Sequence, residues 1–253
     1  MSENMALKDK VVLIVGGSGG IGAASARQFS DAGARVVITH RPGADKASAA
    51  ANLLTTFRGD GHAALPADVA DTATLLALRD AIEARYGRLD VLVNSSGFTK
   101  PVPHSDLDAL DDELIDRMFA VNWRGQFATI RTFAPLLKAS GDGLIVSVSS
   151  IAGMTGAGSS IAYCATKAGI DVMTKSLARS LAPEVRVLGV SPGVVDTGFV
   201  PGRGADFNAK TAATTPLKRV ATADDVAAAI LSCATHLTFS TGTTLVVDGG
   251  RSL

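Results

Sequence analysis

The chain of 253 residues has a formal net charge of zero, with 24 Lys and Arg against 24 Asp and Glu, and 47% of its residues are hydrophobic. This length and apolar content suit one large α/β domain spanning residues 1–253, and they exclude a small disulfide-stabilised scaffold. The balanced charge and the lack of any basic run argue against nucleic acid or an anionic membrane as partner. A small-molecule ligand is therefore expected.

The N-terminal stretch and the two cysteines bear on localisation, disulfides and metal binding. The N-terminal stretch MSENMALKDK is polar and lacks the apolar core of a signal peptide, and the uncharged run 143–166 is too rich in Gly, Ser and Thr to span a bilayer. We therefore expect a cytoplasmic protein. Cys164 and Cys233 lack CxxC spacing and clustered histidines, which predicts neither a disulfide framework nor a metal site.

Runs rich in Val, Ile and Leu alternate with longer Ala- and Leu-rich segments of helical spacing. The runs predict strands at 10–15, 35–39, 63–66, 89–93, 144–148, 185–190 and 243–247; the segments predict helices at 21–32, 71–86, 115–137, 162–181 and 224–236. This alternation predicts a doubly wound, Rossmann-type, mainly parallel seven-stranded sheet flanked by helices. The Gly-rich segment 191–216 lacks strand character, so we expect a mobile substrate lid within 194–216.

A glycine-rich loop joins the first predicted strand to the first predicted helix. It reads Gly16-Gly17-Ser18-Gly19-Gly20-Ile21-Gly22. Glycines let the backbone turn tightly and approach a pyrophosphate, whose charge is met by the amides at the helix N-terminus. The alternative is an ordinary flexible turn, but the position between strand and helix favours a dinucleotide site.

The second motif is YCATK, which places Tyr163 and Lys167 four residues apart on a predicted helix. Side chains at this spacing share one face, so the ammonium could lower the pKa of the phenol and make it a usable acid. A chance surface pair on an amphipathic helix is the alternative.

Together these motifs resemble the short-chain dehydrogenase/reductase family over essentially the whole chain. The matching features, in order, are GxxxGIG, Asp68-Val69, Asn94-Ser95-Ser96-Gly97, Asn122 in VNWRGQF, Ser150 thirteen residues before Tyr163, Pro192-Gly193 with Thr197, and TGTTLVVDGG. The chain departs from the family pattern at Val15, Ser95, Ser96, Leu188 and Gly189, none of which is a catalytic position.

The resemblance implies a catalytic tetrad of Asn122, Ser150, Tyr163 and Lys167. Tyr163 would protonate a carbonyl oxygen during hydride transfer, and Ser150 would hydrogen-bond the same oxygen. Lys167 would tune Tyr163 and hold the nicotinamide ribose, while Asn122 would hold a water that links Lys167 to solvent. From the residues alone, Ser150 could instead cap a loop, as could its neighbours Ser147 and Ser149, and Asn122 could be a helix-surface amide.

The residues at the end of the second predicted strand favour NADP(H) over NAD(H) as the cofactor. The second predicted strand ends in His40 and Arg41, where NAD-dependent relatives commonly carry an acidic residue; a guanidinium can bind a 2′-phosphate, although Arg41 could simply be solvated. Asp68 and Val69 would hold the adenine, and Thr197 the carboxamide. The full expected set is Gly16, Ser18, Gly19, Gly20, Ile21, Gly22, His40, Arg41, Asp68, Val69, Asn94, Ser95, Gly97, Tyr163, Lys167, Pro192, Gly193, Val195 and Thr197.

The substrate is less defined by the sequence. The chain resembles 3-oxoacyl-acyl-carrier-protein reductases, but a free ketone, aldehyde, sugar or other secondary alcohol fits as well. The expected pocket residues are Met154, Phe98, Phe199 and Phe207, and Arg203 and Lys210 in the lid could meet an acid or be solvated. A non-catalytic dinucleotide sensor stays open as a second class. The family resemblance also implies a homotetramer or homodimer.

Overall fold

The structure is a computed structural model that describes residues 6–253. Seven parallel strands form one sheet in the order β3-β2-β1-β4-β5-β6-β7. Their bounds are β1 Val11–Val15, β2 Arg35–His40, β3 Ala63–Pro66, β4 Val91–Asn94, β5 Gly143–Val148, β6 Val185–Pro192 and β7 Thr244–Val247. The doubly wound parallel sheet predicted from the sequence is confirmed.

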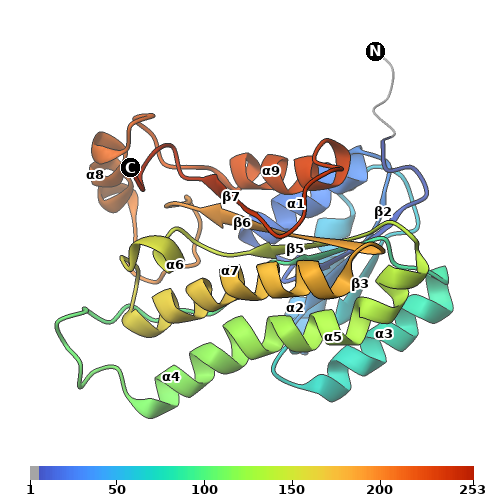
Figure 1. Cartoon of the computed structure of the whole chain (residues 1–253), viewed down its shortest axis with the longest axis horizontal. Coiled ribbons are helices and arrows are strands. Elements are labelled where there is room, and N and C mark those ends of the chain that lie inside the picture. Colours follow the sequence, from blue (N-terminus) through green and yellow to red (C-terminus); the bar gives the residue numbers. More distant parts are fainter. Residues whose placement is uncertain (1–5) are drawn as a thin grey trace.

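Helices cover both faces of this sheet (Figure 1). One face carries α1 (Gly20–Asp31), α2 (Ala44–Leu54) and α9 (Ala223–Thr235), whose buried side chains share one apolar cluster. The other face carries α3 (Thr72–Tyr86), α5 (Gly125–Ala139) and α7 (Ile161–Leu181). Two separate apolar cores therefore enclose the sheet.

Strand β1 shows why the strands are almost continuously apolar. Leu13 and Val15 belong to the core under α3, α5 and α7, while Val12 and Ile14 belong to the core under α1, α2 and α9. Successive side chains of a strand point to opposite faces, so a strand buried on both faces needs apolar residues at every position.

The single helix expected over 115–137 is three consecutive segments. These are α4 (Asp112–Met118), a π-helical turn (Phe119–Arg124) and α5. Such turns insert one extra residue per turn and are frequent at functional sites. Here the π-helical turn contains the buried Asn122.

Three helices were not expected from the sequence. They are α2, the short α6 (Ala152–Thr155) and α8 (Ala205–Thr214), which lies within the expected lid. Strand β6 also continues two residues further than expected, to Pro192. Among residues 6–253, no helix is long and apolar enough to cross a membrane.

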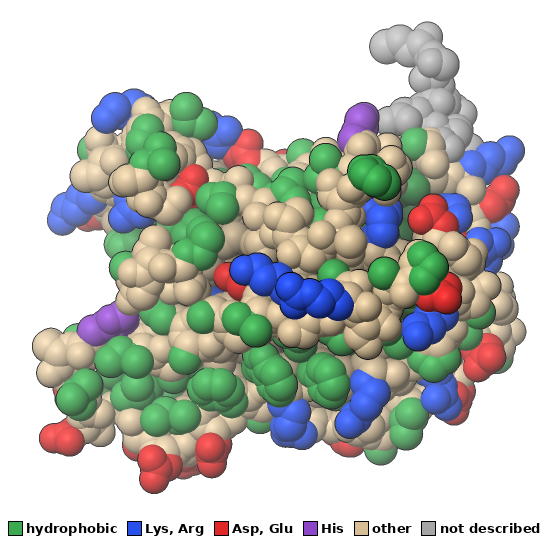
Figure 2. All heavy atoms as spheres, viewed as in Figure 1, with side chains coloured by type: hydrophobic (Ala, Val, Ile, Leu, Met, Phe, Trp, Pro, Cys, Tyr) green, Lys and Arg blue, Asp and Glu red, His purple; other side chains and the backbone are tan. Residues whose placement is uncertain are grey.

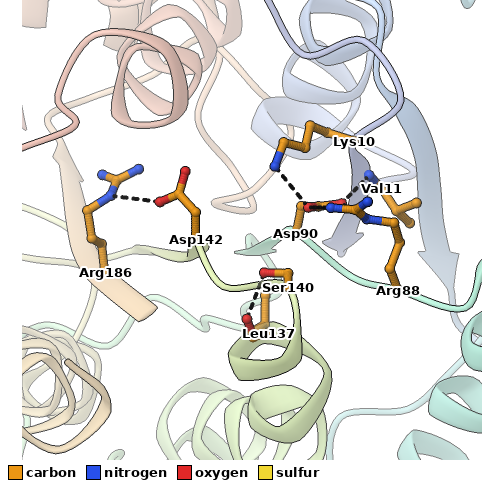
Figure 3. A network of polar contacts seen from close by, with 8 residues as sticks. All are labelled: Lys10, Val11, Arg88, Asp90, Leu137, Ser140, Asp142 and Arg186. Atoms are coloured by element: carbon orange, nitrogen blue, oxygen red, sulfur yellow. Dashed lines mark hydrogen bonds and ion pairs between the residues drawn. The ribbon is translucent and has the colours of Figure 1, made fainter. Parts of the chain in front are cut away.

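A buried carboxylate joins the starts of β1 and β4 (Figure 3). The glycine loop follows the other end of β1. Asp90 accepts hydrogen bonds from Lys10 Nζ at 3.1 Å, Val11 N at 2.9 Å and Arg88 Nη2 at 2.6 Å. Burial raises the pKa of Asp90, but Arg88, Val11 and Lys10 together hold it below the usual value. Asp90 is therefore charged in the native protein and links the N-terminal ends of β1 and β4.

Candidate active site

A cavity of about 1070 Å³ opens at the carboxyl edge of the sheet. It runs from the start of α1, past the ends of β4, β5 and β6, to α8 and the C-terminal turn. In open parallel sheets this edge, beside the point where the strand order reverses, is where ligands bind. Here the reversal falls between β1 and β4.

The glycine loop is shaped by contacts that a side chain would prevent. Gly16 has φ +79°, and a Cβ on it would lie 2.7 Å from the Ser96 amide nitrogen. A Cβ on Gly22 would overlap the carbonyl oxygen of Gly16. These two glycines bring β1, α1 and the end of β4 together. At Gly19, by contrast, a Cβ would meet no atom within 4 Å, so the backbone faces open space.

The N-terminus of α1 has no side-chain cap. Its N-cap residue is Gly19, and the first turn carries no acidic residue. Uncapped amides and the helix dipole together favour an anion such as a pyrophosphate. The open backbone at Gly19 and the uncapped helix therefore fit a dinucleotide, and Gly19, Gly20 and Ile21 line the cavity.

Tyr163 is fixed in the first turn of α7. Its backbone N–H donates to Ser160 Oγ, the N-cap of the helix, at 3.2 Å. Burial raises the pKa of Tyr163 to about 12, against the opposing effects of the nearby Ser150 hydroxyl and of the Arg203 charge. In this structure the phenol is therefore protonated at neutral pH.

Lys167 is almost fully buried, with 3% of its surface exposed. Its Nζ donates to the carbonyl oxygen of Val148 at 2.8 Å and lies 5.6 Å from the centroid of the Tyr163 ring. Burial lowers the pKa of Lys167 to about 8, although Asp171, one turn further along α7, acts in the opposite direction. The ammonium is thus close to the Tyr163 ring, although its hydrogen bond goes to the Val148 carbonyl oxygen.

The serines that follow β5 have distinct partners. Ser150 lines the cavity beside Tyr163, and its Oγ accepts from the Ala152 N–H at 3.2 Å. Ser149 Oγ instead donates to the Lys167 carbonyl oxygen at 3.1 Å and is buried. Ser147 is buried within β5. Of the three, Ser150 is the one whose hydroxyl acts on the pKa of Tyr163.

Asn122 lies outside the cavity lining and is fully buried. Its Oδ1 accepts from the Phe98 N–H at 2.7 Å, and its Nδ2 donates to the Phe98 carbonyl oxygen at 2.9 Å and to Thr166 Oγ1 at 3.3 Å. The side chain therefore joins the loop after β4 to α7, next to Lys167.

The expected cofactor residues fall into two groups along the carboxyl edge. The first lines the cavity with Tyr163 and Lys167 and comprises Gly19, Gly20, Ile21, Ser95, Gly97, Pro192, Gly193, Val195 and Thr197. The second lies outside the lining and comprises Gly16, Ser18, Gly22, His40, Arg41, Asp68, Val69 and Asn94. Its members lie at the carboxyl ends of β1, β2, β3 and β4 or in the segments that follow these strands, so they lie on the same edge of the sheet.

Within the second group, the end of β2 bears on the choice of cofactor. His40 is buried, and its Nδ1 is 2.9 Å from the Arg41 carbonyl oxygen. The Arg41 side chain is exposed and forms no ion pair with any carboxylate of residues 6–253. Asp68 Oδ1 accepts from the Ala70 N–H at 2.9 Å, which shapes the turn after β3.

The far part of the cavity differs from the expected pocket. Phe199 and Phe207 line it, and the Phe199 and Tyr163 ring centroids are 6.1 Å apart. Met154 and Phe98 are not in the lining; Met154 is half exposed, and Phe98 packs beside Met118 and Tyr163 in a small apolar cluster. Lys210 also lies outside the lining.

Several polar residues of the cavity were missed from the sequence, including Arg251 and Asn208. Both of these line its far part. Arg251 is 88 residues from Tyr163 in the chain, and no motif marks it. Only the folded chain brings the C-terminal turn to the cavity.

The chain matches a family model described as enoyl-(acyl carrier protein) reductase over residues 16–252. It is 38% identical to a protein assigned as ketoacyl reductase 2 of the granaticin polyketide synthase of Streptomyces violaceoruber, with 96% of each chain covered. It is 37% identical to cis-4-hydroxycyclohexanecarboxylate dehydrogenase of Sinomonas cyclohexanicum, with 97% of each covered.

A solved structure is similar over the same extent. It is a short-chain dehydrogenase/reductase (glucose/ribitol dehydrogenase) from Brucella melitensis, with a TM-score of 0.87, 31% identity, and coverage of 97% of this chain and 98% of that one. The chain therefore belongs to the short-chain dehydrogenase/reductase family. It is an oxidoreductase of a family that uses a nicotinamide dinucleotide.

Proposed function

We propose that the protein is an NADP(H)-dependent oxidoreductase that interconverts a carbonyl and a secondary alcohol, with Tyr163 as the acid and base. The observation that carries the proposal is the meeting of Tyr163, Ser150 and Lys167 in one cavity. That cavity also reaches the uncapped N-terminus of α1, where a dinucleotide fits. A binding protein without catalysis has no need of this arrangement.

The chain's own groups carry the proton chemistry. When bound, the nicotinamide supplies the hydride in reduction and accepts it in oxidation. The Tyr163 hydroxyl donates its proton to the carbonyl oxygen in reduction, and in oxidation the Tyr163 phenolate takes the proton of the alcohol. Ser150 Oγ donates a hydrogen bond to the same oxygen and stabilises the charge that develops on it.

Lys167 acts on the phenolate that forms when the proton leaves Tyr163. A buried ammonium 5.6 Å from the ring stabilises a negative charge there, since few water molecules screen it. Asn122 is hydrogen-bonded to Thr166, the residue before Lys167, and thereby helps to position Lys167. We assign Asn122 a positioning role; its part in a proton relay is a further element of the proposal.

The preference for NADP(H) rests on Arg41. Its exposed guanidinium follows β2 at the carboxyl edge, and it has no competing carboxylate among the described residues. A guanidinium can form two charge-assisted hydrogen bonds to a phosphate. Asp68, Val69, Asn94 and Thr197 complete the proposed cofactor set.

The relatives' names leave the substrate open between acyl thioesters and free carbonyl compounds. The test uses the purified protein with NADPH or NADH and three substrates: a 3-oxoacyl thioester, 4-oxocyclohexanecarboxylate and an aldose. Cofactor consumption is followed by absorbance. We expect reduction of at least one substrate, faster with NADPH. Binding of NADPH without turnover of any of these compounds in either direction would instead favour a dinucleotide sensor.

We also infer that the protein forms a homodimer or homotetramer. An exposed groove between the π-helical turn, α5 and α7 is lined by Trp123, Phe127, Val172, Met173 and Leu177. Val172 in this groove is 63% exposed, and a contiguous exposed apolar surface of this kind is typical of a protein–protein contact. Light scattering on the wild type and on Val172→Glu tests this inference: an oligomer that dissociates in the variant supports it, and a monomeric wild type contradicts it.

A further inference from the structure

The cavity carries excess positive charge at its far end. Its charged lining residues are Lys167, Asp196, Arg203 and Arg251. Lys167 has the proposed role of stabilising the Tyr163 phenolate. Asp196 accepts a hydrogen bond from Asn208 Nδ2 at 2.8 Å. Among residues 6–253, neither Arg203 nor Arg251 forms an ion pair with a carboxylate. Two guanidinium groups therefore face the cavity without a protein anion to neutralise them.

Arg251 is held in place by the turn that follows β7. Asp248 accepts from the Gly250 N–H at 2.8 Å and from the Ser252 N–H at 2.7 Å, which fixes the backbone on both sides of Arg251. The guanidinium Nη1 then donates to Thr214 Oγ1, at the end of α8, at 3.1 Å. A guanidinium held in this way loses little conformational entropy when it binds an anion.

Arg203 lies nearer to the reacting groups. Its guanidinium carbon is 4.4 Å from the centroid of the Phe207 ring, one turn along the chain. Its charge lowers the pKa of Tyr163, and the charge of Arg251 in turn acts on Arg203. Lys and Arg side chains gather around α8 and the C-terminus on this corner of the molecule (Figure 2). Arg203 and Arg251 therefore form one positive region that extends toward Tyr163.

We propose that Arg203 and Arg251 form a subsite for a carboxylate on the substrate, so that the enzyme acts on small carbonyl or hydroxy compounds that carry an acid group. The inference deepens the proposed function and rests on it. The substrate's carbonyl or alcohol group would lie at Tyr163 and Ser150. Its apolar skeleton would lie along Phe199 and Phe207, and its carboxylate would be bound by the two arginines.

The position of the two arginines argues for the substrate rather than a cofactor phosphate. The uncapped N-terminus of α1 suits a pyrophosphate, whereas Arg203 and Arg251 lie beside α8, beyond Phe199. One relative, 37% identical over 97% of both chains, is named for a cyclic hydroxy acid, cis-4-hydroxycyclohexanecarboxylate. Such a compound has an alcohol and a carboxylate at opposite ends of an apolar ring.

The test compares cis-4-hydroxycyclohexanecarboxylate with its neutral carboxamide, which has nearly the same size. We measure kcat/KM for both compounds in the wild type, Arg203→Gln, Arg251→Gln and the control Lys210→Gln. The expected wild-type preference for the acid falls about ten- to hundredfold in each arginine variant, as for the loss of a hydrogen bond to a charged group. Lys210 lies on α8 outside the cavity lining, so Lys210→Gln keeps the preference.

Equal rates for acid and amide in the wild type would overturn the subsite while leaving the proposed function intact. The same would follow if Lys210→Gln lost the preference as the arginine variants do. Fluorescence titration with NADPH tests whether the arginine binds a cofactor phosphate instead. A loss of NADPH affinity in Arg203→Gln that matches the loss of kcat/KM would assign the arginine to the cofactor.

A binding measurement decides the matter if neither compound turns over. Calorimetry with cyclohexanecarboxylate, in the presence of oxidised cofactor, reports on the subsite without chemistry. Binding to the wild type that is lost in both arginine variants supports the subsite even if the proposed activity fails. No binding to the wild type overturns it.

Discussion

The Lys167 ammonium lies 5.6 Å from the centroid of the Tyr163 ring and donates its hydrogen bond to the Val148 carbonyl instead of to the phenol. Burial then moves the pKa values of the two groups in opposite directions: that of Tyr163 rises to about 12, and that of Lys167 falls to about 8. In both cases burial disfavours the charged form. Burying an ammonium next to the proposed acid therefore lowers the free energy of unfolding.

Replacing Lys167 by Met tests that cost. Below pH 8 the lysine is protonated in both the folded and the unfolded states, and its burial reduces the free energy of unfolding. A pKa shift from 10.5 to about 8, at roughly 1.4 kcal/mol per unit, sets an upper limit of about 3 kcal/mol. Since the hydrogen bond to Val148 is also lost, we expect Lys167→Met to be more stable by about 1–3 kcal/mol at pH 7.

The stability difference between Lys167→Met and the wild type should shrink as the pH rises. Between pH 8 and pH 10 the native lysine loses its proton while the unfolded one keeps it, so wild-type stability rises and the advantage of the variant shrinks. Urea unfolding at pH 7, 8, 9 and 10 measures this difference. Lys175→Met, at an exposed position of α7, serves as the control and should show no such trend. A Lys167→Met variant less stable than the wild type at pH 7 would show that burial of the ammonium does not lower the free energy of unfolding.

Gly189 leaves the space that Thr244 fills. The two residues pair across β6 and β7, and a Cβ on Gly189 would lie 2.5 Å from Thr244 Oγ1. That hydroxyl donates to Asp171 Oδ1 at 3.2 Å. We expect Gly189→Ala to lower the free energy of unfolding by about 1–3 kcal/mol through overpacking.

Thr244→Ala removes the clashing hydroxyl and should rescue part of that loss. In a double-mutant cycle we therefore expect Gly189→Ala and Thr244→Ala together to cost less than the sum of the two single changes. Thermal unfolding of the four proteins measures the coupling. Strict additivity would show that no steric conflict exists between the two positions.

Asp90 should contribute more to stability than the other carboxylate in the same region. Asp90→Asn removes a buried charge that binds Lys10 and Arg88, so we expect a loss of about 1–3 kcal/mol at pH 7. The exposed Asp142 is 4.0 Å from Arg186, and Asp142→Asn should cost less than about 0.5 kcal/mol.

The contribution of Asp90 should also depend on acid. Because the folded state lowers the pKa of Asp90, this stabilisation is complete above the ordinary value near 4 and is lost as the pH falls through the lower native value. Wild type and Asp90→Asn should thus converge in stability at acid pH. A constant difference between pH 7 and pH 2 would exclude the electrostatic explanation.

Much of the fold could be predicted from the sequence because its signals are local. The runs of β1 and β6 and the helical spacing of α7 lie in short windows, and the YCATK spacing alone put Tyr163 and Lys167 on one helix face. The π-helical turn around Asn122 could not be predicted, since the apolar spacing continues through it. Helix α8 lies in a Gly-rich segment whose pattern gave no helix.

The site was predictable to the extent that it consists of motifs. Arg251 could not be found, because it reaches the cavity only through the Asp248 turn and Thr214, which are distant in sequence from Tyr163. The direction of the pKa shift of Tyr163 could not be predicted from the sequence either. The YxxxK spacing predicts a lowered value, whereas burial in the folded protein raises it.

Arg41→Ala tests the proposed cofactor preference. If the guanidinium binds a 2′-phosphate, its removal should weaken NADPH affinity about ten- to hundredfold and change NADH affinity by less than about threefold. Fluorescence titration with each reduced cofactor gives both constants. Arg58→Ala, an exposed arginine at another part of the surface, is the matched control. An equal loss for both cofactors would remove the argument for NADP(H).

Tyr163→Phe tests whether Tyr163 transfers the proton in a hydride-transfer reaction. We would measure turnover of the best substrate in the panel together with NADPH affinity, for the wild type and the variant. We expect turnover to fall by at least about a hundredfold, the range of general acid catalysis, while NADPH affinity changes little. Turnover close to that of the wild type would contradict proton transfer by Tyr163.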